Sequence, residues 1–467
     1  MNNFERNYWS SYCDFIDKFG SLTYLGISIP LVSPYYVLIH ENAINKLKSK
    51  SFNKFVSTNI KQEKGIQSHF DKRLSPYKKK INKQKGKIVL YDTALRIPDH
   101  MLKENFSPTE TMILLQNTTT DENAHSLPAV PLLQFSNVDT KVIEAFQEKT
   151  IKCLNKAKFH PIYRDEKFRK RLINLIPKIM RQISAAVNFF EVTPVSCLVL
   201  GTTNSSDTRV LALAAALRGI PTICLQHGVP MLEFGYLPKV ATYLGVYGKY
   251  DIEWYAKKGI PLTKLKVIGH PRFDELSNNK LMDKKAFHSH FKLDPERKTV
   301  LMVIHHEETE IPHAIIAQLR KQDKVNIIVK PRNGKQSASE KTALLQKAFP
   351  DVRFAEETDL YDILHNVDSV VSYESTIVLE ALLADKPVFI WRLKSLVPSS
   401  TNYYGRLKDY ICNDPRTLVK NLTKTLEGKG DMDKWGKNKK IFLAYKYSPL
   451  TGKSINNLKA LIHSLTT

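Results

Sequence analysis

His227 and Gly228 are the residues of this sequence best placed for acid–base chemistry, because they end the apolar run 220–228. A neutral imidazole titrates near working pH, so His227 could accept a proton from an attacking hydroxyl group. A glycine next to it lets a substrate come close to the backbone. The alternative is a structural histidine that caps a turn, and spacing alone leaves both interpretations open.

Ser375 and Thr376 form a second candidate site, at the start of an expected helix that directly follows the apolar run 368–373. The first backbone N–H groups of a helix attract phosphate, and two hydroxyl groups would add further donors. Glu380 lies further along the same helix, where a carboxylate could hold the hydroxyl groups of a ribose. Ordinary helix capping by Ser375 or Thr376, and a solvated charge at Glu380, are the alternatives.

Lys330 and Arg332 form a third candidate, at the end of the apolar run 324–332. Two cations there could neutralise a diphosphate, and the arginine could do so through two parallel hydrogen bonds. A basic turn in a basic protein is the alternative.

His305 follows the apolar run 298–304 and is expected to line a cleft as a polar group. The next residues, His306, Glu307 and Glu308, offer metal-ligating side chains. Adjacent residues of a strand point to opposite faces, however, so we predict no metal site there. The Gly-rich patterns GxGxxG and GxxxxGK[ST] are both absent from the sequence.

Short apolar runs alternate with helical segments twice along the chain, which predicts two parallel sheets covered by helices on both faces. The expected strands of the first set are 195–201, 220–228, 241–248 and 264–272, and those of the second are 298–306, 324–332, 368–373 and 386–391. The predicted fold class is therefore α/β, with two doubly wound Rossmann-like domains that face a cleft. Ligands of such sheets bind at the carboxyl ends of the strands, where the candidate residues lie.

Changes in composition predict four segments. We expect an N-terminal extension with a basic linker at 1–87, an acceptor domain at 88–275, a nucleotide-donor domain at 296–430 and a helical tail at 431–467. The linker, 61–87, reads either as a solvated stretch or as a contact for a membrane surface or another polyanion.

The charge of the chain is strongly positive, since 70 Lys and Arg against 46 Asp and Glu leave +24 over 467 residues. Such a surface favours polyanions, among them nucleic acid, anionic lipid and phosphorylated substrates. Nucleic acid is an unlikely partner, because the basic runs lack interleaved aromatic residues and no helix-turn-helix or zinc-finger spacing occurs.

The cysteines and the N-terminus indicate the cytoplasm. The five cysteines show no CxxC pair, and the first 15 residues carry charges and no apolar signal core. The longest apolar run near the N-terminus has about 16 residues and two prolines, whereas a membrane span needs about 20. We predict a cytoplasmic protein, with peripheral contact to the anionic inner face of the membrane as a further expectation.

Three stretches of the sequence resemble the GT-B superfamily, and within it the CDP-glycerol glycerophosphotransferase-like and capsular polysaccharide glycosyltransferases. They are His227-Gly228, the segment 269–274 (GHPRFD) and the block 359–391. The resemblance implies that His227 is the acceptor-side catalytic group, with Gly228 and Arg272 beside it. It also implies that Ser375, Thr376 and Glu380 hold the donor nucleotide.

The predicted function is transfer of a glycosyl or glycerol-phosphate unit from a nucleotide-sugar or CDP-glycerol donor to a cell-surface glycan or lipid-linked acceptor. The nucleotide-activated donor is a substrate, and no separate cofactor is expected. Epimerisation or hydrolysis of a sugar nucleotide on the same fold is the main alternative, and a basic nucleic-acid-binding protein is a weaker one.

Overall fold

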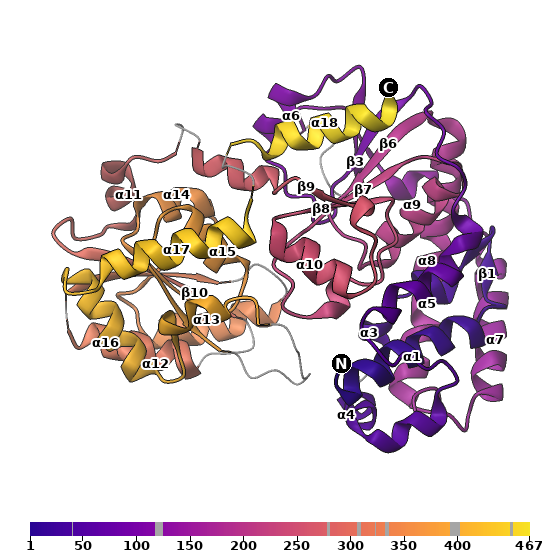
Figure 1. Ribbon diagram of the computed structural model, residues 1–467, viewed down its shortest axis with the longest axis horizontal. Helices are drawn as coiled ribbons and strands as arrows, with labels where there is room; N and C mark the ends of the chain where they lie inside the picture. Colours follow the sequence, from indigo (N-terminus) through magenta and orange to yellow (C-terminus); the bar gives the residue numbers. More distant parts are fainter. Residues whose placement is uncertain are drawn as a thin grey trace. The chain divides into compact units, whose positions relative to one another are not determined.

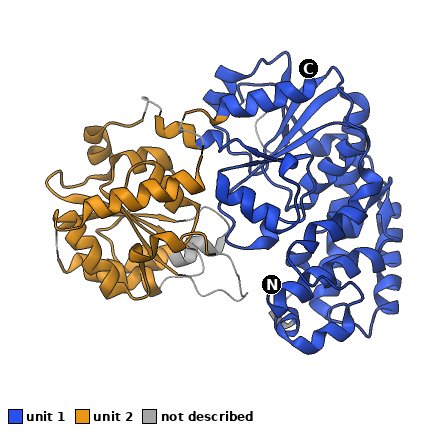
Figure 2. Cartoon of the chain, in the orientation of Figure 1, with its two compact units in different colours: residues 1–272, 397–401, 455–467 blue, residues 273–396, 402–454 orange. Residues whose placement is uncertain are grey.

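The computed structural model describes every residue of the chain except 40, 117–124, 278–280, 306–309, 323, 332–335, 393–401 and 449–451. The described residues form two compact units (Figures 1 and 2). Unit 1 contains Met1–Arg272 and Ile455–Thr467, and unit 2 contains Phe273–Leu396 and Asn402–Ser454. Each unit is built around its own parallel sheet.

The sheet of unit 1 has the strand order β5-β4-β3-β6-β7-β8-β9. The chain thus begins in the middle of the sheet, winds to one edge, and then returns to wind toward the other edge. In this doubly wound order the winding reverses between β3 and β6, and ligands bind at the carboxyl ends next to that point. The strands are β3 (Lys87–Tyr91), β4 (Thr111–Leu115), β5 (Ala129–Pro131), β6 (Val195–Leu200), β7 (Thr222–Leu225), β8 (Tyr243–Val246) and β9 (Leu265–Val267).

Successive residues of the central strands pack into different cores, because strand side chains alternate between the two faces of a sheet. Leu198 packs into the core that contains α8 and α9, and Cys197 packs into the core that contains α6 and α18. Helices therefore cover both faces, as the apolar strands require (Figure 1). These helices and their neighbours are α6 (Asp99–Asn105), α7 (Thr140–Lys156), α8 (Glu166–Val192), α9 (Ser206–Ala216), α10 (Lys249–Lys257) and α18 (Ser454–Thr466).

The described residues before β3 pack mainly as a helical layer on the α8–α9 core. Trp9 and Phe70 belong to the same continuous hydrophobic core as Phe168 of α8. The first helix starts at a capping box, in which the Asn2 side chain and Glu5 bond to each other's backbone N–H groups. The helices of this layer are α1 (Asn3–Lys18), α2 (Ile29–Val32), α3 (Tyr35–Leu38), α4 (Glu41–Lys48) and α5 (Gly65–Leu74), beside a small hairpin of β1 (Thr23–Tyr24) and β2 (Ile27–Ser28).

The sheet of unit 2 repeats the same topology, with the strand order β12-β11-β10-β13-β14-β15 and a reversal between β10 and β13. Its strands are β10 (Lys298–Ile304), β11 (Val325–Pro331), β12 (Arg353–Phe354), β13 (Ser369–Tyr373), β14 (Val388–Trp391) and β15 (Ile411–Cys412). Its helices include α11 (Lys284–Phe291), α12 (Glu310–Arg320), α13 (Gln336–Ala348), α14 (Leu360–Asn366), α15 (Thr376–Leu383), α16 (Pro415–Leu426) and α17 (Met432–Lys446). Two doubly wound domains were predicted, and two are present.

The described residues of 431–467 contribute to both units. The first helix of this segment, α17, belongs to unit 2, whereas almost all of α18 belongs to unit 1. Ile455 and Leu458 of α18 pack into the core on the sheet face that α6 also covers. Among the residues that the structure describes, no helix has both the length and the apolar character needed to cross a bilayer.

Candidate functional site

In unit 1, His227 lies just beyond the carboxyl end of β7 with its ring held in place by stacking. The rings of His227 and Tyr236 are nearly parallel, with 4.7 Å between their centroids and 5° between their planes. Tyr236 is fixed in turn, because its hydroxyl donates to the carbonyl of Val229 over 2.9 Å. The imidazole, which is half-buried, thus reaches the sheet edge in a defined orientation, and Gly228 is buried directly after it.

A small space lies next to this imidazole. A methyl group added at Gly235 would lie 3.9 Å from Nε2 of His227 and 3.8 Å from Nδ2 of Asn204, so both polar groups border the same space. Gly235, His227 and Tyr236 line a pocket together with Thr202 and Thr203 of the loop after β6. A hydroxyl group bound there would have a proton acceptor and an amide donor within reach.

Two arginines add positive charge to this edge. The loop after β3 carries Arg96, whose Nη1 lies 3.5 Å from the backbone oxygen of His227. The loop closes tightly on β6, since a Cβ on Gly201 would lie 2.2 Å from the carbonyl carbon of Ala94. Only a glycine at position 201 permits this approach, and both Ala94 and Arg96 adopt left-handed backbone conformations, with φ of 56° and 53°.

Arg272 lies on the same edge beside the fully buried His270. Nδ1 of His270 accepts the backbone N–H of Arg272 over 3.2 Å. Burial lowers the pKa of His270 well below its usual value, and Arg272, Arg96 and His227 lower it further. His270 is therefore a neutral ring, and the positive charge of the edge rests on the arginines. His227 and Arg272 both lie close enough to His270 to lower its pKa, so they lie at the same edge of the unit 1 sheet.

Two carboxylates at this edge were not predicted from the sequence. Asp207, in the first turn of α9, is buried and accepts hydrogen bonds from the Tyr91 hydroxyl over 2.6 Å and from Nε2 of Gln116 over 2.8 Å. Asp92, directly after β3, accepts the backbone N–H of Gln116 over 3.0 Å, and burial raises its pKa. Asp92 directly follows a strand and Asp207 lies in the first turn of a helix, and these positions could have indicated both residues from the sequence. Together they fix the polar groups on either side of the winding reversal.

In unit 2, three predicted residues lie near the winding reversal. His305 follows β10, and its ring meets that of Tyr373 edge-on, with 5.1 Å between the centroids. Ser375 and Thr376 open α15 after the neighbouring strand β13, and both are half-buried. In the described structure the Ser375 side chain makes no capping hydrogen bond, while its carbonyl accepts from the Tyr404 hydroxyl. The start of α15 is thus not closed by the Ser375 side chain.

The remaining residues predicted to bind the donor are Lys330, Glu380 and Arg332. Nζ of Lys330 donates to the carbonyls of Ala355 over 2.9 Å and Thr358 over 2.8 Å, and burial lowers its pKa. Lys330 therefore holds the loop after β12 with two of its three N–H donors. Glu380 is only 5% exposed within α15. Arg332 lies outside the described residues.

One ion pair at this edge was not predicted. Nε of Arg392, after β14, lies 3.5 Å from a carboxylate oxygen of Glu374, after β13. Burial raises the pKa of Glu374, and Arg392 opposes that effect.

Known proteins resemble this chain in structure but not in sequence: no family model and no curated protein matches it. The UDP-GlcNAc 2-epimerase of Neisseria meningitidis, bound to UDP-GlcNAc, matches with a TM-score of 0.53 and 13% identity over 81% of this chain and 99% of its own. The S. aureus protein MnaA, in a co-structure with UDP, matches with a TM-score of 0.50 and 11% identity over 81% of this chain and 96% of its own. The wall teichoic acid polymerase TagF matches with a TM-score of 0.49 and 14% identity over 86% of this chain and 92% of its own. The first two likenesses, with the strand orders, confirm the predicted GT-B-like fold.

Proposed function

We propose that this protein is a transferase that moves a glycosyl or glycerol-phosphate unit from a nucleotide-activated donor to a cell-surface polysaccharide or lipid-linked acceptor. The observation that carries the proposal is the setting of His227. Its ring is fixed by Tyr236, and its Nε2 borders the same space as the Asn204 amide. That arrangement suits the activation of a hydroxyl group, which is the first requirement of such a transfer.

On the acceptor side, His227 takes the proton of the acceptor hydroxyl as its oxygen attacks the donor. The new bond forms to the sugar carbon or the phosphorus, and the bond to the leaving nucleotide breaks. Arg96 and Arg272 keep this edge positive. The pKa of the neighbouring His270 is strongly lowered, so His270 is a weak base and does not compete with His227 for the proton. Fixed positive groups of this kind stabilise anionic charge as it develops.

On the donor side, unit 2 supplies the nucleotide site. The first turn of α15 carries the Ser375 and Thr376 hydroxyls and the positive end of a helix dipole, which suits a phosphate group. His305 lies at the neighbouring strand end. Glu380 remains a proposed donor contact on the resemblance to GT-B transferases. Lys330 and Arg332 remain proposed contacts of a diphosphate because they are two cations at the end of an apolar run.

A basic surface supports a contact with an anionic membrane or polymer. Eight lysines of the segment 61–87 are exposed: Lys61, Lys64, Lys72, Lys78, Lys79, Lys80, Lys83 and Lys85. Each lysine near an anionic leaflet contributes about 1 kcal/mol to binding. Sedimentation with vesicles that contain anionic lipid should therefore carry the protein down at low salt and lose it at high salt.

The experiment that tests the function is a thermal-shift series with CMP, CDP, UMP, UDP, GDP and ADP, with Thr376→Val and Glu380→Ala alongside the wild type. A ligand at 100 times its dissociation constant stabilises a protein by about 2.7 kcal/mol. We expect one nucleotide to stabilise the wild type selectively, and the variants to respond less. Indifference to all six nucleotides would contradict the proposal.

A second candidate, epimerisation or hydrolysis of a sugar nucleotide, is favoured by the likeness to UDP-GlcNAc 2-epimerase. Incubation of the protein with the selected nucleotide sugar, without any acceptor, separates the two reactions. Turnover of the donor alone would identify the epimerase or hydrolase, and turnover that requires an added glycan would identify the transferase.

A further inference from the structure

The N-terminal helix α1 contacts one of the two loops that line the pocket beside His227, and it reaches the other through Arg209 of α9. We call them the β6 loop, residues 201–205, and the β7 loop, residues 226–237. The β6 loop contributes Thr202 and Thr203 to the pocket, and the β7 loop contributes Gly235 and Tyr236. These loops are separated in sequence from α1 by almost 200 residues or more, and the contacts are made by different residues of the helix.

Arg209 connects the β6 loop to α1. Its guanidinium is 2% exposed and donates from Nε to the carbonyl of Thr203 over 2.8 Å. From Nη1 it donates to the carbonyl of Ser33 over 3.0 Å and to the hydroxyl of Tyr12 in α1. A buried guanidinium must have its donors paired, so the position of the Thr203 carbonyl depends on Tyr12 and Ser33.

Phe234 connects the β7 loop to α1 by ring packing. Its centroid lies 4.4 Å from that of Tyr8 and 5.7 Å from that of Trp9, both in α1. It also stacks on Tyr36, with 4.9 Å between centroids and 6° between planes. Aromatic pairs in this range stabilise the packing beyond the effect of the area they bury.

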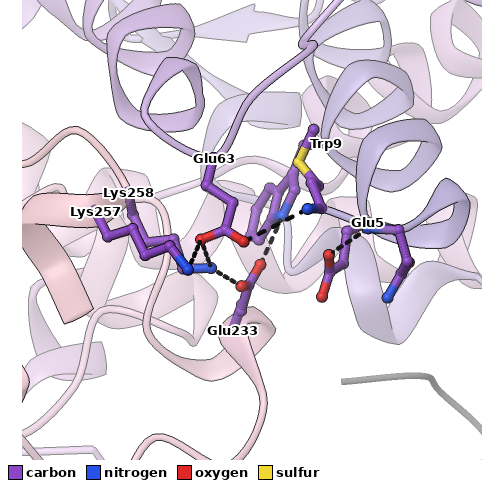
Figure 3. A network of polar contacts seen from close by, with 8 residues as sticks. Glu5, Trp9, Glu63, Glu233, Lys257 and Lys258 are labelled. Atoms are coloured by element: carbon purple, nitrogen blue, oxygen red, sulfur yellow. Dashed lines mark hydrogen bonds and ion pairs between the residues drawn. The ribbon is translucent and has the colours of Figure 1, made fainter. Parts of the chain in front are cut away.

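A polar contact fixes the residue before Phe234 (Figure 3). Nε1 of Trp9 donates to a carboxylate oxygen of Glu233 over 3.1 Å, while the ammonium of Lys258 bonds to the other oxygen and, over 3.0 Å, to Glu63. Burial raises the pKa of Glu233, an effect that Lys258 opposes. Glu233 is therefore held from α1 and from the end of α10 at once.

We propose that α1 sets the position of the His227 pocket, and that Trp9 and Tyr12 are positioning residues for it. Trp9 fixes Glu233, which lies three residues before the Tyr236 ring that stacks on His227. Tyr12 fixes Arg209 and through it the β6 loop. One helix thereby aligns two loops. The expected effect on kcat rests on the proposed function, whereas the expected effect on the loops does not.

The test uses the full-length protein with Trp9→Phe and Tyr12→Phe, which keep an aromatic ring. Trp9→Phe removes the indole N–H that donates to Glu233, and Tyr12→Phe removes the hydroxyl that accepts from Arg209. Tyr163→Phe is the control, because its hydroxyl is buried in the same core, near Ser11 of α1, and no hydrogen bond in the described structure connects it to the β6 loop or the β7 loop. The first readout is amide hydrogen exchange in the β6 and β7 loops. The second is kcat and KM of transfer, with nucleotide binding measured beside them.

We expect Trp9→Phe to speed exchange in the β7 loop, and Tyr12→Phe in the β6 loop, by about tenfold each, because each loses a bond to a charged group. The kcat of transfer should fall by about 10- to 100-fold, with the KM for the donor unchanged. Exchange and kcat equal to those of Tyr163→Phe would overturn the proposal. A uniform rise in exchange across unit 1 would also overturn it, since that indicates general destabilisation. If the wild type transfers nothing, the proposed function fails, and the exchange rates still decide the inference.

Discussion

The two sheets share a doubly wound pattern, with seven described strands in unit 1 and six in unit 2, but the side chains at their carboxyl edges are held in different ways. At the edge of unit 1, Asp207, His270 and Arg272 are buried, and residues from distant segments fix the polar groups, as Tyr91 and Gln116 fix Asp207. At the edge of unit 2, Ser375 and Thr376 are half-buried at a helix start. The difference suggests a division of labour. A fixed imidazole suits proton transfer, which depends on alignment, whereas a helix start suits the capture of an anion from solvent.

The strongest test of this comparison is His227→Ala. If the unit 1 edge performs the proton transfer, kcat should fall by about 10³-fold, within the range for loss of a general base. Nucleotide binding should be unchanged, because the donor is assigned to unit 2. Steady-state kinetics and the thermal shift with the selected nucleotide measure the two effects. Transfer at the wild-type rate would remove His227 from the mechanism and contradict the assignment of proton transfer to unit 1.

The buried charges of unit 1 should give the next largest effect. Lys258 is 2% exposed and lies between Glu233 and Glu63, so Lys258→Met leaves two carboxylates without their shared cation. Breaking such a buried pair should lower the free energy of unfolding by about 3–4 kcal/mol. The neighbouring Lys257 is 70% exposed and lies 3.5 Å from Glu63.

Lys257→Met is therefore a matched control, and urea unfolding of the two variants checks the prediction. An exposed pair contributes at most about 1 kcal/mol, so Lys257→Met should change the free energy of unfolding by less than that. Equal losses of unfolding free energy in the two variants would show that Lys258 stabilises the protein no more than an exposed lysine does. The unit 1 edge would then be less tightly held than its contacts indicate.

The strands and the residues at their ends could be predicted from the sequence, because both follow from local patterns. Apolar β-rich runs indicate buried strands, and polar residues directly after them must lie at the sheet edge, which located His227, His305, Ser375 and Thr376. Lys330 was also placed at a strand end, but local spacing does not reveal that its ammonium binds the carbonyls of a later loop.

The role of residues 1–87 could not be predicted, because their partners are far away in the sequence. Trp9 bonds to Glu233 across 224 positions, and Arg209 to Tyr12 across 197. Asp207 likewise depends on Tyr91, which lies 116 positions earlier. A pattern of mixed aromatic and charged residues shows that a segment packs, but not against what.

Lys239 tests the unit 1 side of the comparison through pH. It lies between β7 and β8, is buried, and bonds to the carbonyl of Ala241; burial lowers its pKa from 10.5 to about 8. Between those two values the unfolded chain binds more protons than the folded one, so this lysine makes stability rise with pH. Lys239→Met should remove that rise.

The difference between the wild type and Lys239→Met isolates this contribution from all other titrating groups. The free energy of unfolding, measured in urea at pH 8 and pH 10, should increase by about 2 kcal/mol more in the wild type than in the variant. Parallel pH dependences would show that Lys239 is solvated in the folded protein, and that the loop after β7 is looser than its contacts indicate.

The smallest effect is expected at the unit 2 edge, from Arg392→Ala. The Arg392 side chain is 50% exposed and that of Glu374 is 17% exposed, with 3.5 Å between the paired atoms. Solvent screens a pair of this kind, so the free energy of unfolding should change by less than about 1 kcal/mol.

Because Glu374 immediately precedes Ser375, the more informative readout is nucleotide binding. We expect the affinity for the selected nucleotide to change by less than threefold, since the helix start at Thr376 does not depend on this pair. A loss as large as that in Lys258→Met would mean that the unit 2 edge is organised by buried charge as well, and the two edges would then differ only in how much solvent reaches them.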